Sequence, residues 1–332
     1  MKKSLIYLFS LLCMLTLVTS CSDDEKGGTD DAWKEISKDY TSDKLSIGTV
    51  STSGTISVNA VSVDKATIIL NNVVAGESSV SVDATLTKTD AGYAFEGEST
   101  ATTCNVKVSG TIENGKLTAA ISRTLTSSLT GTMDLNFISG ESLMAQTYFE
   151  INTGNTEQDA ILKGMATSFL GQLIAQQVES VSVELGEEGT FSFSFKKVGA
   201  SEETVMPPAK LQEMIKSYLT WYEKENVLYL AVHKDALTIL SGLNILPENI
   251  DLETILGLLT VEGDYYTIPL QVKEEDGLTT IYLNKDILVK VWEVAKPLVG
   301  NIQDETIQSI LAMVDQVMAS AKEIEVGLVF KK

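Results

Sequence analysis

The chain of 332 residues contains one arginine, one histidine, three cysteines and five prolines. Its formal net charge is −20, from 25 basic and 45 acidic residues. Nucleic-acid binding needs clustered lysine and arginine to replace the counterions of the phosphate backbone, and this chain has the opposite charge. Hydrolytic triads and most zinc sites need histidines, so His233 would have to serve alone. The composition therefore argues against a nucleic-acid partner, and it suggests no metal or other cofactor.

The few cysteines exclude disulfide chemistry from the expected mature protein. We expect Cys13 to be removed with the apolar N-terminal run and Cys21 to be acylated, as argued below, which leaves Cys104 as the one free thiol. Cys104 begins the alternating run 104–108, which is typical of a strand. We interpret it as a small buried hydrophobe and not as a nucleophile.

The long apolar run predicts a secretory signal peptide over residues 1–20. Lys2 and Lys3 precede 14 mostly apolar residues, Leu5 to Val18. A membrane-spanning helix needs about 20 such residues, so the run is too short to span. The sequence Val-Thr-Ser-Cys at 18–21 resembles a bacterial lipobox. The resemblance implies cleavage before Cys21 and acylation of Cys21, and two or more acyl chains hold a protein firmly on a bilayer. An ordinary leader with a chance cysteine is the alternative.

Acidic residues follow the predicted acylation site, in the order Ser22, Asp23, Asp24 and Glu25. This cluster resembles the surface-export signal of Bacteroidetes outer-membrane lipoproteins. The resemblance implies a cell-envelope protein anchored in the outer membrane and exposed at the cell surface. The alternative is that the cluster is only part of a flexible acidic tether over 21–39, in a protein that faces the periplasm.

Two-residue periodicity dominates residues 40–138 and predicts an all-β domain. The run 79–86 places Val, Val, Ala and Leu on one face, and Asn114-Gly115 supplies the two positive-φ residues of a type I′ hairpin turn. About eight strands recur at roughly ten-residue spacing, which is typical of an antiparallel meander, either a barrel or a sandwich. The last strand of the series is expected at 133–137.

Three segments of this meander resemble the calycin-like domains of Bacteroidetes lipoproteins. They are ATIILNN at 66–72, GYAFEG at 92–97 and VSGTIENGKL at 108–117. The resemblance covers about residues 44–138 and rests on turn and strand residues. It implies a small barrel-like fold and, by analogy with lipocalins, a capacity to bind a ligand, although a fold alone does not fix a function.

Residues 139–332 predict a second domain of the α+β class, with an antiparallel sheet and helices on one face. Thr156 is expected to cap a helix that turns an apolar stripe inward. The stripe consists of Leu162, Met165, Phe169 and Leu173. Residues 218–237 and 265–288 resemble two copies of one repeat, a hairpin followed by a helix. Asp235 and Asp286 are expected to cap the two helices. Chance similarity between two capped helices is the alternative.

The candidate ligand-binding residues are aromatic. Tyr218, Trp221 and Tyr222 lie on one predicted strand, where flat rings could hold the apolar faces of sugars. Packing in the core is the alternative for such residues. The sequence has no GxSxG, HExxH or phosphate-binding Gly-Lys-Thr motif.

We therefore expect a lipid-anchored envelope protein without catalytic residues, metal or cofactor. It would bind a glycan, a small apolar molecule or an outer-membrane protein partner. A glycoside hydrolase-like enzyme is an alternative, because 45 acidic residues offer many carboxylate pairs, and such an enzyme needs two facing carboxylates about 5–10 Å apart. A structural accessory subunit of an outer-membrane complex is a further alternative.

Overall fold

The computed structural model describes residues 32–332 except 49, 141, 209–216, 238–255 and 300–304. The predicted signal peptide, Cys21 and the cluster 22–25 lie outside the described residues. So does most of the helix expected after Asp235. The chain from Trp33 to Lys332 groups into one compact unit by its contacts, so the predicted division near residue 139 stays a prediction.

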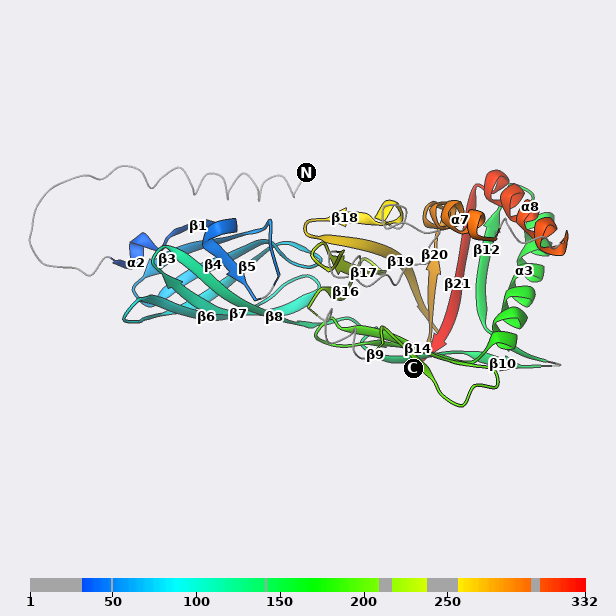
Figure 1. Cartoon of the computed structure of the whole chain (residues 1–332), viewed down its shortest axis with the longest axis horizontal. Helices are drawn as coiled ribbons and strands as arrows, with labels where there is room; N and C mark the ends of the chain where they lie inside the picture. The colour runs from blue at the N-terminus through cyan, green and yellow to red at the C-terminus, as the bar shows by residue number, and fades with distance from the viewer. Residues whose placement is uncertain (1–31, 49, 141, 209–216, 238–255, 300–304) are drawn as a thin grey trace, which may run out of the picture. The chain divides into compact units, whose positions relative to one another are not determined.

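Eight strands of the N-terminal part form one sheet, which we call the barrel sheet (Figure 1). Their order is β1-β3-β4-β5-β6-β7-β8-β2. The strands are β1 (Lys38–Thr41), β2 (Leu45–Ile47), β3 (Thr55–Ser62), β4 (Lys65–Val74), β5 (Glu77–Lys88), β6 (Gly92–Thr100), β7 (Cys104–Glu113) and β8 (Lys116–Leu125). A short helix, α2 (Ala32–Glu35), precedes them.

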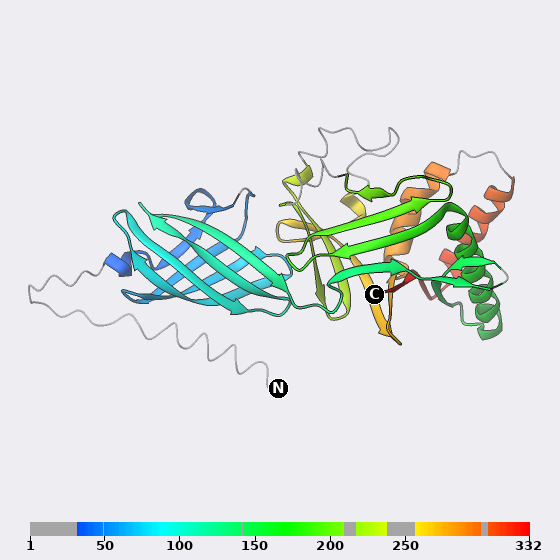
Figure 2. The same ribbon diagram turned by 90° about the horizontal axis from the view of Figure 1, so that it is seen from below.

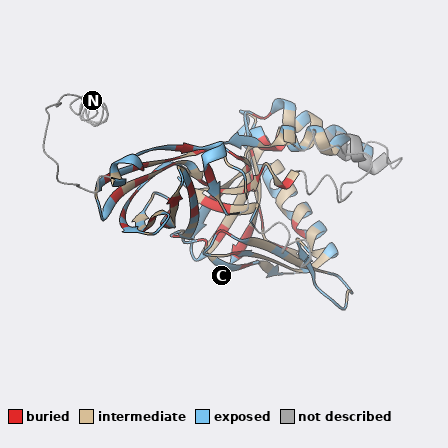
Figure 3. Cartoon of the chain, turned by 60° about the vertical axis from the view of Figure 1, so that its left-hand side comes forward, coloured by how far each residue is buried: buried red, intermediate tan, exposed pale blue. Residues whose placement is uncertain are grey.

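The local patterns explain the meander from β3 to β8. Buried and exposed residues alternate along β5, as the period of its apolar residues predicts. Figure 3 shows buried and exposed segments interspersed along the strands of the barrel sheet. Asn114 and Gly115 have φ values of 50° and 74°, and they join β7 to β8 where Glu113 pairs with Lys116. The predicted two-residue hairpin turn is therefore confirmed.

The first two strands nearly close this sheet into a barrel. β1 pairs antiparallel with β3, and β2 pairs parallel with β8 at the other edge of the meander. The short 3-10 helix η1 (Ser42–Lys44) joins β1 to β2. One segment of ten residues, Lys38 to Ile47, thus bridges both edges of the sheet.

Side chains fill the interior of the barrel sheet. Those with no exposed surface include Tyr40, Ile56, Ile68, Leu70, Val82, Cys104 and Val106. A cavity that admits water would expose part of its lining, so these residues touch no such space. An eight-stranded barrel is just wide enough for side chains to fill it. Burial also raises the pKa of the Cys104 thiol, which fits its interpretation as a buried hydrophobe.

Eleven later strands form a second sheet, which we call the larger sheet (Figure 2). Its main order is β15-β14-β13-β9-β21-β20-β19-β17-β16, with β12 on β21 and β18 on β19. The strands are β9 (Gly131–Leu135), β12 (Thr147–Asn152), β13 (Val178–Leu185), β14 (Phe191–Lys197), β15 (Thr204–Met206), β16 (Leu219–Lys224), β17 (Val227–His233), β18 (Thr260–Glu262), β19 (Tyr265–Glu275), β20 (Leu278–Leu283) and β21 (Glu323–Lys331). A separate hairpin pairs β10 (Phe137–Ser139) with β11 (Leu143–Ala145).

One strand belongs to a different sheet from the one predicted. The strand expected at 133–137 as the last of the first series is β9, which lies between β13 and β21 in the larger sheet. Met133 pairs with Val183, and Leu135 pairs with Phe330. These apolar partners come from far along the chain, so the local pattern could not reveal them.

The larger sheet curls so that its two ends approach one another. The backbone N–H of Trp221 in β16 donates to the carbonyl of Gly189, in the turn between β13 and β14. The indole N–H of Trp221 donates to the carbonyl of Gly186 in the same turn, at 3.0 Å. The larger sheet therefore has a concave inner face.

Three long helices accompany this sheet: α3 (Thr156–Gln177), α7 (Lys285–Val299) and α8 (Glu305–Ser320). Their caps lie close to the predicted ones but on other residues. Asn155 accepts a hydrogen bond from the Gln158 N–H, and Asn284 accepts one from the Ile287 N–H. The predictions of Thr156 and Asp286 as caps are therefore wrong by one or two positions, because an asparagine just before each helix takes the role.

The predicted inward stripe of α3 is mostly exposed. Met165, Phe169 and Leu173 are 63%, 51% and 44% exposed, whereas the row that contains Leu170 and Ile174 is half-buried. A Cβ at Gly171 would lie 2.6 Å from the Ala145 carbonyl oxygen, so this glycine brings the other face of α3 against β11. Apolar residues occur on both sides of α3, and its period alone could not identify the packed side.

Replacing Met165 and Phe169 together by glutamine is expected to change the free energy of unfolding by no more than about 0.5 kcal/mol. Both side chains are more than half exposed, so little buried area is lost. Leu170→Gln on the packed row should cost at least about 1–2 kcal/mol. Urea unfolding of the three proteins measures the difference, and a larger loss in the double variant would contradict this placement of α3.

Candidate functional site

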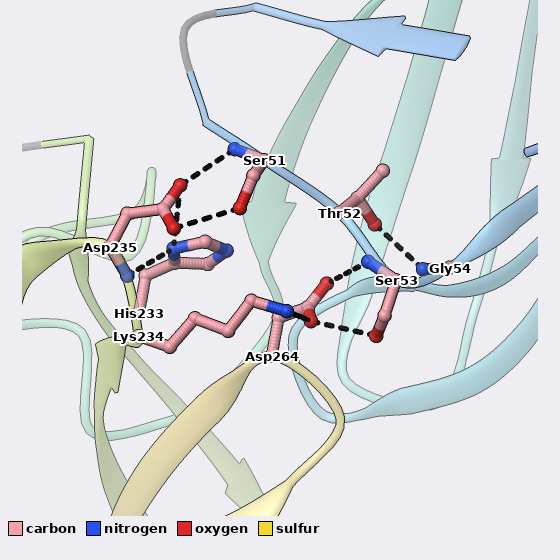
Figure 4. A network of polar contacts seen from close by, with 8 residues as sticks. All are labelled: Ser51, Thr52, Ser53, Gly54, His233, Lys234, Asp235 and Asp264. Carbon is pink, nitrogen blue, oxygen red and sulfur yellow. Dashed lines mark hydrogen bonds and ion pairs between the residues drawn. The ribbon is translucent and has the colours of Figure 1, made fainter. Parts of the chain in front are cut away.

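Two serines of the loop between β2 and β3 contact two carboxylates in loops of the larger sheet (Figure 4). Asp235 lies just after β17, and Asp264 lies in the turn between β18 and β19. The N–H and hydroxyl of Ser51 donate to Asp235 at 2.7 and 2.8 Å. The N–H and hydroxyl of Ser53 donate to Asp264, both at 2.7 Å. We call residues 51–54 with His233, Lys234, Asp235 and Asp264 the joint. Each carboxylate at the joint thus receives two hydrogen bonds from one serine.

The carboxylates of the joint are held in the ionised form. The Asp264 side chain is 3% exposed and pairs with Lys234. Burial alone would raise the pKa of Asp264, but hydrogen bonds from Lys234 and Ser53 outweigh it and lower the pKa to about 2. The hydrogen bond from the Ser51 N–H likewise lowers the pKa of Asp235.

A general acid of a glycosidase needs a raised pKa, and the carboxyl groups of the joint have the reverse. Wherever a shift is resolved for a carboxyl group in the described part of the chain, its pKa is lowered. No group of three or more His, Cys, Asp and Glu residues in that part could hold a metal ion. The joint is therefore best explained as a structural contact.

His233 lies inside the joint, with 2% of its surface exposed. Its Nδ1 accepts a hydrogen bond from the Asp235 N–H at 3.2 Å, and its ring meets the Tyr265 ring edge-on at 5.1 Å. Burial lowers the pKa of His233, although Asp235 and Asp264 oppose the shift. The imidazole is therefore neutral at pH 7 and serves as an acceptor.

Acidification from about pH 7 to about pH 5 is expected to destabilise the protein partly through His233. The folded-state pKa lies below the unfolded value of about 6.5, so the unfolded chain takes up a proton first. Stability from this group is present above the unfolded pKa and is lost as the pH falls through it. His233→Gln should show a shallower loss in urea unfolding between the two pH values. Equal losses in the two proteins would contradict the assignment.

The three aromatic residues predicted as a ligand site differ in how far they are buried. Trp221 and Tyr222 are 0% and 1% exposed, whereas Tyr218 is half-buried. Gly76 lies in the turn between β4 and β5 of the barrel sheet. A Cβ there would lie 2.7 Å from the Tyr222 ring, so the ring packs directly on this turn. The Tyr222 hydroxyl donates to Glu262 at 2.5 Å. Ligand binding by these three residues stays a prediction, but two of them have no ring face open to a sugar.

Arg123 of β8 contacts β16, the strand that carries Trp221 and Tyr222. Its guanidinium donates to the Trp221 carbonyl at 3.1 Å and to the Ala75 carbonyl at 3.2 Å, and it also contacts the Thr220 hydroxyl. The sole arginine of the chain is thus used between the two sheets.

An apolar groove lies between α3 and the larger sheet. It encloses ≈ 270 Å³ and is lined by Thr147, Leu170, Ile174, Leu270, Ile281, Tyr282, Leu283, Val326, Gly327 and Leu328. Leu328 pairs with Thr147 on one side and with Ile281 on the other, and Val326 pairs with Leu283. Residues paired directly across strands share a face, so these side chains lie on one face of the sheet, with Leu170 and Ile174 of α3 beside them.

The sequence contained part of the signal for this groove. Apolar residues recur at every second position at the end of the chain, which is typical of a strand, and they lie on β21: Ile324, Val326, Leu328 and Phe330. The groove itself could not be predicted, because it needs β12, β19 and β20 beside β21 and the correct face of α3 above them. The pairing of β12 with β21 joins residues more than 100 positions apart.

Comparison of the chain with family models, with curated proteins and with solved structures finds no match. The structure therefore defines the class by itself, as a mostly β protein that joins a nearly closed eight-stranded barrel to an eleven-stranded sheet. No helix among the described residues has both the length and the apolar character needed to cross a membrane.

Proposed function

We propose that this protein is a non-catalytic, lipid-anchored envelope protein that binds a small apolar ligand in the groove between α3 and the larger sheet. The observation that carries the proposal is the groove, where side chains of four strands and one helix leave ≈ 270 Å³ beside them. Ligand sites are typically concave, mostly apolar and largely preformed. The calycin-like resemblance suggests that a ligand binds inside the barrel. Because side chains fill the interior of the barrel sheet, we place the ligand site on the larger sheet instead.

Binding can be tested with a neutral fluorescent probe, N-phenyl-1-naphthylamine. We would use the full chain with Cys21→Ala, so that no acyl group of the predicted anchor competes for the groove. Ile174→Trp adds volume where α3 lines the groove, and we expect it to weaken probe binding at least tenfold. Ile161→Trp is the matched control on the outer side of the same helix, where the side chain is 58% exposed, and it should change binding less than twofold.

Two results of this titration count against the proposal. A wild-type chain that does not bind the probe would contradict it directly. Equal binding by both tryptophan variants, each with wild-type circular dichroism, would place the probe elsewhere. If the wild-type chain binds the probe and only Ile174→Trp weakens that binding, the result supports the groove as the binding site.

The proposal of a lipid anchor is argued from the sequence of residues 1–25, which precede the described residues. We expect Cys21→Ala to abolish labelling by a radioactive fatty acid and to shift the protein from the membrane fraction to the soluble fraction. Replacing Asp23, Asp24 and Glu25 by asparagine and glutamine should preserve membrane association but lower accessibility to external protease. Undiminished label in the first variant would contradict acylation, and unchanged protease access in the second would contradict surface export.

A second candidate, a protein partner in the outer membrane, is favoured by the exposed row on α3. Ile161, Met165, Phe169 and Leu173 are each at least 44% exposed and follow one another at four-residue steps. Exposed apolar patches often mark interaction sites. Met165→Gln with Phe169→Gln should then release a membrane protein that crosslinks to the wild-type chain, without changing probe binding.

A further inference from the structure

We infer that the ligand of the groove is a lipid with a single hydrocarbon chain and a headgroup that carries no negative charge. This inference rests on the proposed function and adds the ligand class to it. It follows from the size of the groove, from its polar content and from the charges of the elements around it.

The size of the groove suits one chain. Its ≈ 270 Å³ lies just below the range of about 300–1,000 Å³ that is typical of sites for drug-sized ligands. Two acyl chains side by side or a fused-ring lipid would need more space. A single chain gains about 0.8 kcal/mol for each buried methylene, so a chain of moderate length suffices for binding.

The groove offers almost nothing to a polar headgroup. Among its lining side chains, Thr147 has a hydroxyl that already donates to the Thr167 carbonyl at 3.0 Å. Tyr282 also lines the groove, and its ring packs on Tyr148 at 5.0 Å. A sugar would lose its hydrogen bonds to water here without replacement, which is costly. The hydrocarbon part of a ligand therefore occupies the groove, and its headgroup stays in water.

The charges around the groove disfavour an anionic headgroup. The five elements that line it, β12, α3, β19, β20 and β21, carry three lysines and seven acidic residues, a net charge of −4. Two of the lysines are paired already, since Lys163 contacts Glu150 and Lys273 contacts Glu275. The whole chain carries a charge of −20. A carboxylate or phosphate would meet this excess of negative charge, whereas a neutral or cationic headgroup would not be repelled by it.

Three ligands of equal chain length separate these possibilities: decanol, decylamine and decanoate. Each is titrated at about pH 8 and low salt against the probe bound to the Cys21→Ala chain, below its micelle concentration. We expect decanol and decylamine to displace the probe at concentrations at least tenfold lower than decanoate. Because salt screens like-charge repulsion, about 0.5 M NaCl should narrow the gap for decanoate. Ile174→Trp should weaken all three.

The outcomes distinguish this inference from the function on which it rests. If decanoate displaces the probe as well as decanol does, the headgroup inference is wrong and the apolar site stands. If a two-chain diacylglycerol in mixed micelles displaces the probe and the three decyl compounds do not, the single-chain inference is wrong. If the wild-type chain never binds the probe, the proposed function itself fails.

Discussion

Asp264→Ala is expected to lower the free energy of unfolding by about 3 kcal/mol. The side chain is almost fully buried and accepts hydrogen bonds from the N–H and hydroxyl of Ser53 and from Lys234. Alanine would leave the two Ser53 donors without their acceptor in a part-buried site. Lys234 can turn to water because it is 41% exposed, which keeps the loss below that of a fully buried ion pair.

The pH dependence of the free energy of unfolding tests the role of Asp264 in a second way. The folded-state pKa of Asp264 is about 2, below its unfolded value of 3.8. The stabilisation by its charge is therefore present above about pH 4 and is lost as the pH falls through about 2. Guanidinium chloride unfolding of wild type and Asp264→Ala should show a constant difference from about pH 7 to 5 and a smaller one near about pH 3.

Two other aspartates serve as controls for Asp264. Asp90 is exposed in the turn between β5 and β6, so Asp90→Ala should be neutral within about 0.5 kcal/mol. Asp235→Ala removes the equivalent contact with Ser51, but its side chain is 32% exposed, and the loss should be intermediate. A neutral Asp264→Ala would mean that the contacts of the joint add nothing to stability.

The local features of the fold were accessible from the sequence, and the long-range pairings were not. The β7–β8 hairpin could be predicted because Asn114 and Gly115 determine a turn by themselves. The closure of the barrel sheet by β1 and β2 leaves no such signal, since each strand has four residues or fewer. The parallel pairing of β2 with β8 joins Leu45 to Leu117, which are 72 positions apart.

The residues of the joint and of the apolar groove show the same division between local and long-range signals. Asp235 was interpreted as a helix cap, because Asp before an apolar run is typical of one. Its two serine contacts are 184 positions away, so no local pattern could reveal them. The apolar groove likewise depends on four strands that meet only in the folded chain. Sequence reasoning placed Tyr218, Trp221 and Tyr222 near one another along the chain, but it could not distinguish a ligand platform from buried packing. In the structure the Tyr218 ring lies near His233 and the Tyr222 ring stacks on Tyr229.

Trp221→Ala is expected to lower the free energy of unfolding by about 3–5 kcal/mol, among the largest effects of any single substitution in this chain. Trp221 is fully buried, and it is among the largest fully buried side chains of the described residues. Its removal would leave a cavity in the main core and would leave the Gly186 carbonyl without its indole donor. The contact that brings the two ends of the larger sheet together would also be weakened.

Two further variants separate structure from ligand binding at this position. Trp221→Phe keeps most of the ring volume but removes the N–H donor, so we expect a loss of about 1–2 kcal/mol. Tyr218→Ala, at the half-buried member of the same predicted cluster, should cost less than about 1 kcal/mol. If the sugar-platform hypothesis were correct, Trp221→Ala would leave stability nearly unchanged and abolish glycan binding on an array. Because both faces of the indole are enclosed by protein, we expect the opposite: a large loss of stability that Trp221→Phe partly restores.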